Sequence, residues 1–233
     1  SPDQTPRACN RSALAASSLR CLVAAFGDPG HVFPAVSLAR ALQVRGHEVI
    51  VETWPQWEAT VEEAGLEFVS AEHYQVFPPP ASGSPGAGQA ALALMPLREE
   101  FRPDVVVNDI LTVAPALAAE SYGCGWGTLI PHIYPVQDQG MPFFAVGALP
   151  PRNAIGRRFW RTTEKALRFG LERGRDDLNA QREVVGLPPT NRFHGGTSPD
   201  LAMVATYPQL EYPRQWPDSV QITGPMPFEM PHP

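Results

Sequence analysis

Short apolar runs alternate along the chain with segments in which apolar residues recur at helical spacing. The first run, residues 22–26, is continuously apolar, which is typical of a strand that is buried on both faces. The turn formers of residues 27–30 follow it, and apolar positions then recur at helical spacing up to Leu42. The pattern therefore predicts a strand, a tight turn and a helix, with His31 where the helix begins.

Similar units follow this first one. Further strands are expected at residues 48–52, 66–69, 104–109, 126–130, 200–204 and 219–223. Helices are expected at residues 53–64, 89–101, 112–122 and 157–185. Strands that alternate with helices favour an α/β fold, here a Rossmann-like, doubly wound parallel sheet in three α/β/α layers.

Two long loops interrupt this pattern. Residues 77–88, which begin at Phe77, are rich in Pro, Gly and Ser, and form either a surface linker or a binding loop at the mouth of a cleft. Residues 131–151 carry large apolar groups that either line a site for an apolar ligand or partner, or pack back on the core. The candidates in this second loop are His132, Tyr134, Met141, Phe143 and Phe144.

Composition and charge narrow the function classes. The 233 residues are enough for one large α/β domain or two small ones, and the 43% of hydrophobic residues supports a sizeable core. The net charge of -6 and the pI near 5.5 argue against a surface for nucleic acid or anionic lipid. No apolar run reaches the length of about 18 residues that a membrane span needs.

The cysteines and histidines do not form a metal-binding pattern. Cys9, Cys21 and Cys124 lack paired spacing, so we interpret them as free thiols in a reducing compartment, the cytoplasm. A zinc site needs Cys or His pairs at ligand spacing, and the sequence has none. We therefore expect no metal.

Two polar residues stand where predicted strands end. His31 follows the first strand and Asp109 ends the strand at 104–109, and these strands can be neighbours in a doubly wound sheet. A histidine beside a buried carboxylate is a general-base arrangement, because the carboxylate fixes the imidazole tautomer and stabilises the imidazolium. Alternatively, His31 only caps or packs at the helix start, and Asp109 is the N-cap of the next helix.

Other known motifs are incomplete. The turn Gly27-x-x-Gly30 lacks the full G-x-G-x-x-G of a dinucleotide site and the Gly-Lys-Ser/Thr of a P-loop. No G-x-S-x-G sequence occurs, which argues against an α/β-hydrolase.

Several motifs, in order, resemble a known family. Phe26-Gly-Asp-Pro-Gly-His31 is followed by Pro34 and by Arg45-Gly-His-Glu-Val49, and later come Arg102-Pro-Asp-Val-Val-Val-Asn-Asp109 and Ile222-Thr-Gly-Pro225. Together they resemble GT-B glycosyltransferases of the UDP-glycosyltransferase superfamily, in particular bacterial enzymes that act on natural products such as macrolides. The resemblance runs from about residue 19 to residue 225 and covers the N-terminal, acceptor-binding half of the GT-B fold.

The resemblance implies a role for each matched residue. His31 corresponds to the base that deprotonates the acceptor hydroxyl, and Asp109 to its carboxylate partner. The reaction is a single inverting displacement at the anomeric carbon of a nucleotide sugar, UDP- or TDP-linked, with no metal or other cofactor. The N-terminal domain binds a hydrophobic acceptor, and the aromatic residues of the loop at residues 131–151 are suited to this. The turn of Gly27, Asp28 and Gly30 is assigned to the donor side.

The same resemblance implies a domain organisation. Residues 1–18 are expected to be a mobile leader, residues 19–223 the acceptor-binding domain, and residues 224–233 a linker to an absent donor-binding domain. We therefore expect the chain to be inactive alone, and the exposed interdomain face could pair with a second copy or a partner chain. The alternative is a non-catalytic subunit that binds a ligand or partner in the same cleft and needs no base at His31.

Overall fold

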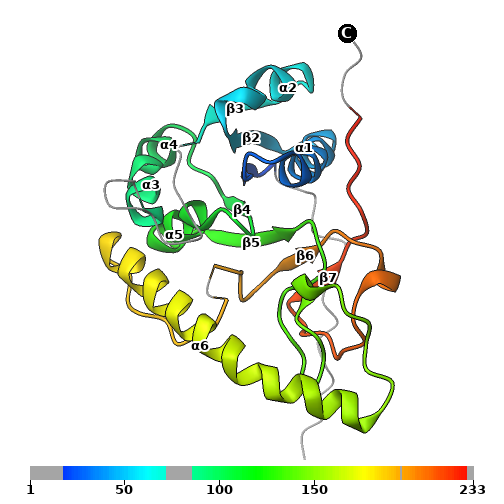
Figure 1. Cartoon of the computed structure of the whole chain (residues 1–233). Coiled ribbons are helices and arrows are strands. Elements are labelled where there is room, and N and C mark those ends of the chain that lie inside the picture. The colour runs from blue at the N-terminus through cyan, green and yellow to red at the C-terminus, as the bar shows by residue number, and fades with distance from the viewer. Residues whose placement is uncertain (1–17, 72–85, 195, 230–233) are drawn as a thin grey trace, which may run out of the picture.

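A parallel sheet forms the centre of the protein. In the residues that the computed structural model describes (18–71, 86–194 and 196–229), its seven strands have the order β3-β2-β1-β4-β5-β6-β7 (Figure 1). The strands are β1 Arg20–Ala24, β2 Glu48–Thr53, β3 Glu67–Ser70, β4 Val105–Asp109, β5 Gly125–Ile130, β6 Ala202–Val204 and β7 Val220–Ile222. The predicted Rossmann-like α/β fold is thereby confirmed, with each predicted strand present.

Helices connect the strands and cover both faces of the sheet. They are α1 Pro29–Val44, α2 Glu58–Glu63, α3 Ala87–Ala93, α4 Met95–Glu100, α5 Val113–Tyr122 and α6 Ala154–Val184, with short 3-10 turns η1 Pro55–Trp57, η2 Phe144–Val146 and η3 Pro208–Leu210. The prediction of one helix over residues 89–101 was wrong. Pro96 lies in the first turn of α4, where its missing N–H is tolerated, whereas inside one continuous helix it would break the hydrogen-bond ladder.

Alternate residues of each central strand face opposite layers. In β1, Val23 packs with Val36 and Ala39 of α1, whereas Leu22 packs with Ala116 and other residues on the side of α5. Both side chains are buried, which explains why the strand is apolar at every position rather than at alternate positions. Figure 1 shows α1 on one face of the sheet and α3, α4 and α5 on the other.

The segment after β7 packs on the domain. Met226 and Phe228 lie against the core cluster around α1, and the rings of Phe33 and Phe228 are 5.7 Å apart between centroids. The chain therefore runs back beside α1 up to residue 229 (Figure 1). That residues 224–233 link to another domain stays a prediction, and the predicted leader and Phe77 lie outside the described residues.

Two further expectations concern the described part of the chain. None of its helices has the length and apolar character needed to cross a membrane. Cys21 and Cys124 are free thiols, and Cys9 falls outside the described residues.

One acidic side chain is buried in the sheet without full hydrogen bonding. Glu52 of β2 is 5% exposed, and its Oε2 atom has no hydrogen-bond partner among the described residues. Burial raises the pKa of the Glu52 carboxyl from 4.5 to about 8. The folded protein therefore holds this carboxyl in its neutral form at pH 7.

We predict that Glu52→Gln stabilises the protein at alkaline pH. The unfolded chain releases the Glu52 proton near pH 4.5, whereas the folded chain keeps it up to about pH 8. The free energy of unfolding should therefore fall between these pH values in the wild type, and less so in the variant. Urea denaturation should show the variant to be more stable at pH 8 by up to roughly 4 kcal/mol, with little difference near pH 4.

The matched control is Glu48→Gln, which changes an exposed glutamate on the same strand. Its pH profile should follow that of the wild type. Parallel profiles for the wild type and Glu52→Gln would show that Glu52 is already ionised in the fold.

Candidate active site

The turn after β1 fixes His31 in the first turn of α1. Asp28 is the N-cap of this helix, and its Oδ1 accepts a hydrogen bond of 2.8 Å from the N–H of Gly30. The Asp28 carbonyl accepts from the N–H groups of His31 and Val32, at 3.0 and 2.9 Å. Asp28 and Gly30, predicted to face the donor, thus start the helix that carries His31; whether they also contact a donor stays a prediction.

The segment after β2 holds this turn in place. The Trp54 ring lies so close to Gly27 that a Cβ atom there would come within 2.0 Å of it, so only glycine fits. The Gly27 carbonyl accepts hydrogen bonds from Trp57 Nε1 at 2.9 Å and from Gln56 Nε2 at 3.1 Å. Gly27 therefore has a packing role. It allows the segment after β2 to pack against the turn after β1, at the carboxyl ends of the two strands.

Asp109 comes to the same edge from the neighbouring strand. β4 pairs directly with β1, with Asn108 opposite Ala24, and β4 ends at Asp109. Asp109 Oδ2 lies 2.7 Å from His31 Nδ1, and its Oδ1 accepts from the N–H of Leu111 at 2.8 Å. The structure thus brings the two predicted residues into direct contact.

This contact determines which ring nitrogen of His31 is available. The Asp109 side chain is fully buried and that of His31 is 14% exposed. A carboxylate can only accept, so Nδ1 carries the proton and donates it to Asp109, which leaves a lone pair on Nε2. The pair can therefore take a proton at Nε2 while Asp109 stabilises the resulting imidazolium.

The alternative that Asp109 caps the next helix is wrong. The N-cap of α5 is Thr112, and the Asp109 side chain bonds His31 and Leu111 instead. Asn108, which the sequence analysis missed, braces this position: its Nδ2 donates to the carbonyls of Asp109 and Thr112 at 3.0 and 3.1 Å. A buried asparagine next to an aspartate at a strand end is a signal that could have identified it.

Aromatic rings lie on both sides of His31. On one side, the His31 ring is 6.1 Å from His132, which stacks on Phe144 at 5.2 Å, and Phe144 contacts Phe143 at 4.7 Å. On the other side, Phe26 lies 6.0 Å from His31 and 4.9 Å from Trp54. We call these residues the aromatic row: Trp54, Phe26, His31, His132, Phe144 and Phe143.

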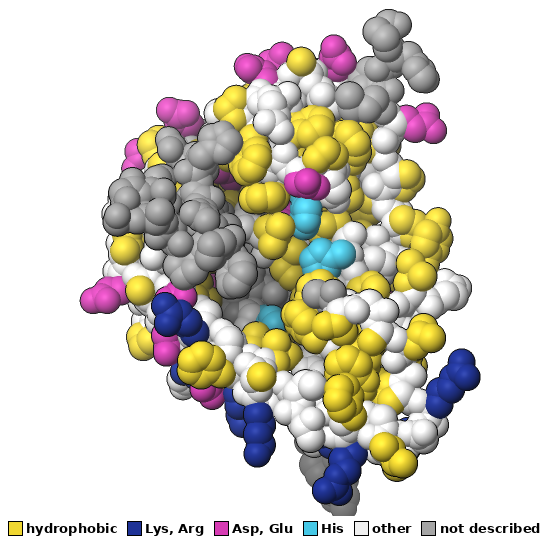
Figure 2. All heavy atoms as spheres, in the orientation of Figure 1, with side chains coloured by type: hydrophobic (Ala, Val, Ile, Leu, Met, Phe, Trp, Pro, Cys, Tyr) yellow, Lys and Arg dark blue, Asp and Glu magenta, His cyan; other side chains and the backbone are white. Residues whose placement is uncertain are grey.

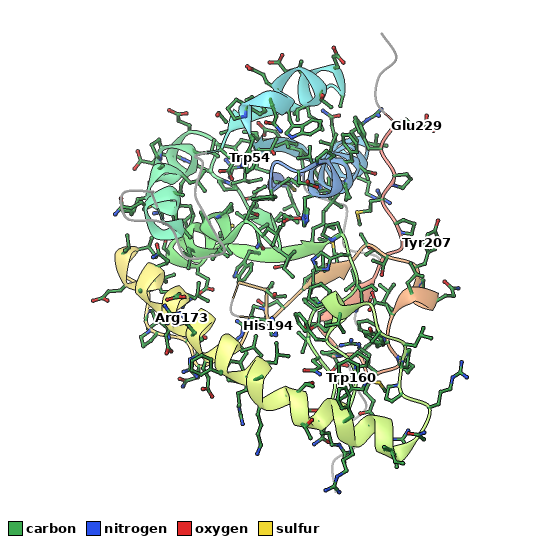
Figure 3. The ribbon with its side chains drawn as sticks, viewed as in Figure 1. Trp54, Trp160, Arg173, His194, Tyr207 and Glu229 are labelled. Carbon is green, nitrogen blue, oxygen red and sulfur yellow. The ribbon has the colours of Figure 1, made fainter. Side chains whose placement is uncertain are left out.

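Figures 2 and 3 show this region from outside. Histidine side chains lie exposed in the middle of the face in Figure 2, with hydrophobic side chains around them. Figure 3 shows Trp54 beside the start of α1. The sequence-based prediction did not include Phe26 or Trp54 among the residues around His31. Phe26 was placed in the first predicted strand, whereas β1 ends at Ala24. Aromatic residues just beyond strand ends were the available signal.

Tyr134, another predicted acceptor residue, does not belong to this series of rings. Tyr134 is buried in a core cluster with Ile130 and Val204, and the Arg214 guanidinium lies 5.1 Å above its ring. The open alternative that loop aromatics pack back on the core therefore holds for Tyr134. Met141 is half-buried, and its backbone bonds to Asp138 and Gln137. Phe77 lies outside the described residues.

No group of three His, Cys, Asp or Glu side chains in the described ranges is arranged to hold a metal ion.

Comparisons with known proteins identify relatives of this domain. Residues 21–124 match the glycosyltransferase family 28 N-terminal domain. The chain is 28% identical to 4'-demethylrebeccamycin synthase of Lentzea aerocolonigenes over an alignment of 240 positions. The alignment covers 88% of this chain and 56% of the relative. The chain thus spans about half the length of this relative.

Solved structures share the fold. The glycosyltransferase of kitacinnamycin superposes with a TM-score of 0.60 at 20% identity, over 89% of this chain and 51% of the other. Glycosyltransferase VinC, solved in complex with dTDP, superposes with a TM-score of 0.57 at 18% identity, over 87% and 52%. The chain therefore shares the Rossmann-like α/β fold of the part of these glycosyltransferases that it covers.

Proposed function

We propose that this chain is the acceptor-binding domain of an inverting glycosyltransferase that moves a sugar from a nucleotide sugar to a hydroxyl of a hydrophobic natural product. The contact of His31 Nδ1 with the buried Asp109 carboxylate carries this proposal. A domain that only binds a ligand does not need a histidine whose tautomer is fixed in this way. The relatedness to 4'-demethylrebeccamycin synthase supports the same reaction class.

In the proposed mechanism, His31 Nε2 accepts the proton of the acceptor hydroxyl. The acceptor oxygen forms a bond to the anomeric carbon as the bond between that carbon and the nucleotide diphosphate breaks. Asp109 stays ionised and stabilises the imidazolium through the hydrogen bond to Nδ1. The bonding electrons leave with the diphosphate as negative charge. We expect no metal or further cofactor, as the resemblance to GT-B glycosyltransferases implies.

The surroundings of His31 fit a hydrophobic acceptor. His132, Phe143 and Phe144 extend from His31 along one side as a continuous series of ring contacts. Such a surface can bury the apolar part of an acceptor while a hydroxyl meets His31. That the VinC structure contains dTDP supports a nucleotide-linked donor for the complete enzyme.

We predict that His31→Ala lowers the rate of sugar transfer about 10²–10⁴-fold. The rate should be measured in a form of the protein that transfers sugar, and acceptor binding should be measured by calorimetry. Binding should stay nearly unchanged, because the aromatic surface remains. An equal loss of binding and rate would instead make His31 a structural residue.

We predict that Asp109→Asn slows transfer in the same direction, by about 10²-fold or more. With its oxygen on the N–H of Leu111, the amide presents its NH2 group to His31 Nδ1 and favours the wrong tautomer. It also does not stabilise the imidazolium as a carboxylate does. The control is Asp104→Asn, because Asp104 pairs with Arg20 at the opposite end of these strands. A normal rate in Asp109→Asn would remove Asp109 from the mechanism and favour the non-catalytic alternative.

We predict that the 233 residues alone bind aglycones without turning over a nucleotide sugar. Calorimetry with aromatic polyketide or macrolide aglycones should give binding, whereas UDP and TDP should give none. The physical reason is that the rings around His31 offer apolar surface for an acceptor. Tight binding of a nucleotide would show that the donor site has been misplaced.

A further inference from the structure

Helix α6 packs on the domain along one side. Near its start, Glu164 accepts a hydrogen bond of 2.8 Å from the N–H of Gly140 in the preceding loop. Near its end, Gln181 accepts from Gly88 of α3 at 2.9 Å, and Arg182 pairs with Glu120 of α5 at 2.8 Å. Trp160 lies on the first half of the helix, where side chains crowd between α6 and this loop (Figure 3). One side of α6 therefore packs against the rest of the domain.

A second apolar stripe runs along the other side of its first half. Ile155 is 80% exposed, Phe159 59% and Phe169 70%. Ile155 lies about 180° around the helix from Glu164, which faces the domain. A helix with apolar residues on two opposite sides is expected to be covered on both, and in the described part of the protein only one side is.

The stripe has the spacing of a helix–helix seam. Its positions follow at intervals of four, three, four and three residues, and all five side chains are exposed: Ile155, Phe159, Thr162, Ala166 and Phe169. At 100° per residue they lie within an arc of about 80°, over a length of about 21 Å. This is the narrow a/d pattern of a coiled-coil seam rather than a broad amphipathic face.

Positive charge lies along one flank of this stripe. Residues 152–168 contain six of the chain's 18 Lys and Arg residues and only one of its 24 Asp and Glu residues. Arg158 and Lys165, both exposed, stand beside the stripe at the position that faces the flank of a partner helix. Figure 2 shows Lys and Arg side chains gathered at the lower part of the molecule, where α6 runs, and Asp and Glu side chains mostly above.

The charge argues against two occupants of the stripe. In an antiparallel pair with a second copy, Arg158 and Lys165 of one helix would lie opposite the same two residues of the other, and like charges at such short range oppose pairing. An anionic membrane would attract these cations but repel the rest of the chain, which carries all but one of the acidic residues. The 80° arc is also narrower than the face of about 100° or more of a typical amphipathic helix.

We propose that the exposed stripe of α6 binds an acidic amphipathic helix of a partner protein. Leu, Ile or similar residues of the partner at a and d positions pack between Ile155, Phe159 and Phe169. Small Ala166 and Thr162 at the centre let the two backbones approach closely. Glutamates on the flank of the partner pair with Arg158 and Lys165. The surface lies on a different element from His31, which is in α1, and from Asp109, which ends β4.

The test uses the whole 233-residue chain and a designed three-heptad peptide of about 21 residues, with Leu at a and d and Glu at e and g. Fluorescence anisotropy of the labelled peptide should show saturable, equimolar binding that weakens as salt is added. Phe159→Glu should weaken binding at least about tenfold, and so should the double variant Arg158→Glu, Lys165→Glu. A peptide with Lys in place of Glu should not bind.

The matched control is Leu210→Glu, which changes an equally exposed apolar residue in η3. It should leave peptide binding unchanged, and circular dichroism should show that each variant is folded. Three results would overturn the proposal: no binding of the acidic peptide, binding that Phe159→Glu does not weaken, or a dimer of the chain alone that Phe159→Glu dissociates. Sedimentation with phosphatidylglycerol vesicles that depends on Phe159 would also overturn it, in favour of a lipid surface.

Discussion

The direct pairing of β1 with β4 is the constraint on which the rest of the site depends. It places Asp109 beside the first turn of α1, so that the carboxylate meets His31 at 2.7 Å. A fully buried carboxylate without partners would cost several kcal/mol, and here the imidazole and the N–H of Leu111 satisfy both oxygens. The same contact therefore makes burial of Asp109 tolerable and sets the tautomer of His31. Stability and proposed chemistry share one hydrogen bond.

This arrangement needs a rigid turn before His31. Gly27 accepts the Trp54 ring against its backbone, and its carbonyl takes two hydrogen bonds from the segment after β2. The strand order puts β2 next to β1 on the side opposite β4. His31 is thus positioned from both neighbouring strands, by packing on one side and by a charge-assisted hydrogen bond on the other.

The fold and the contact between His31 and Asp109 could be predicted from the sequence because both leave local signals. Strands buried on two faces are continuously apolar, and polar residues at their carboxyl ends share one edge of the sheet. The sequence gives no such signal for where the aromatic side chains of a loop pack. Tyr134 and Phe144 belong to the same loop, yet Tyr134 lies in the core and Phe144 stacks on His132. Which ring turns inward depends on tertiary partners such as Trp216 and Arg214, which lie far along the chain.

Net charge was the least informative of the sequence features. A value of -6 argues against attraction of the chain as a whole to polyanions, but it averages over a helix whose first half is strongly basic. Periodicity alone also described α6 incompletely, because it predicts a helix over residues 157–185 without showing which side the domain covers. Only the fold shows which stripe the domain covers. Once Glu164 is seen to face the loop at Gly140, the side that carries Ile155, Phe159 and Phe169 must be the outer one.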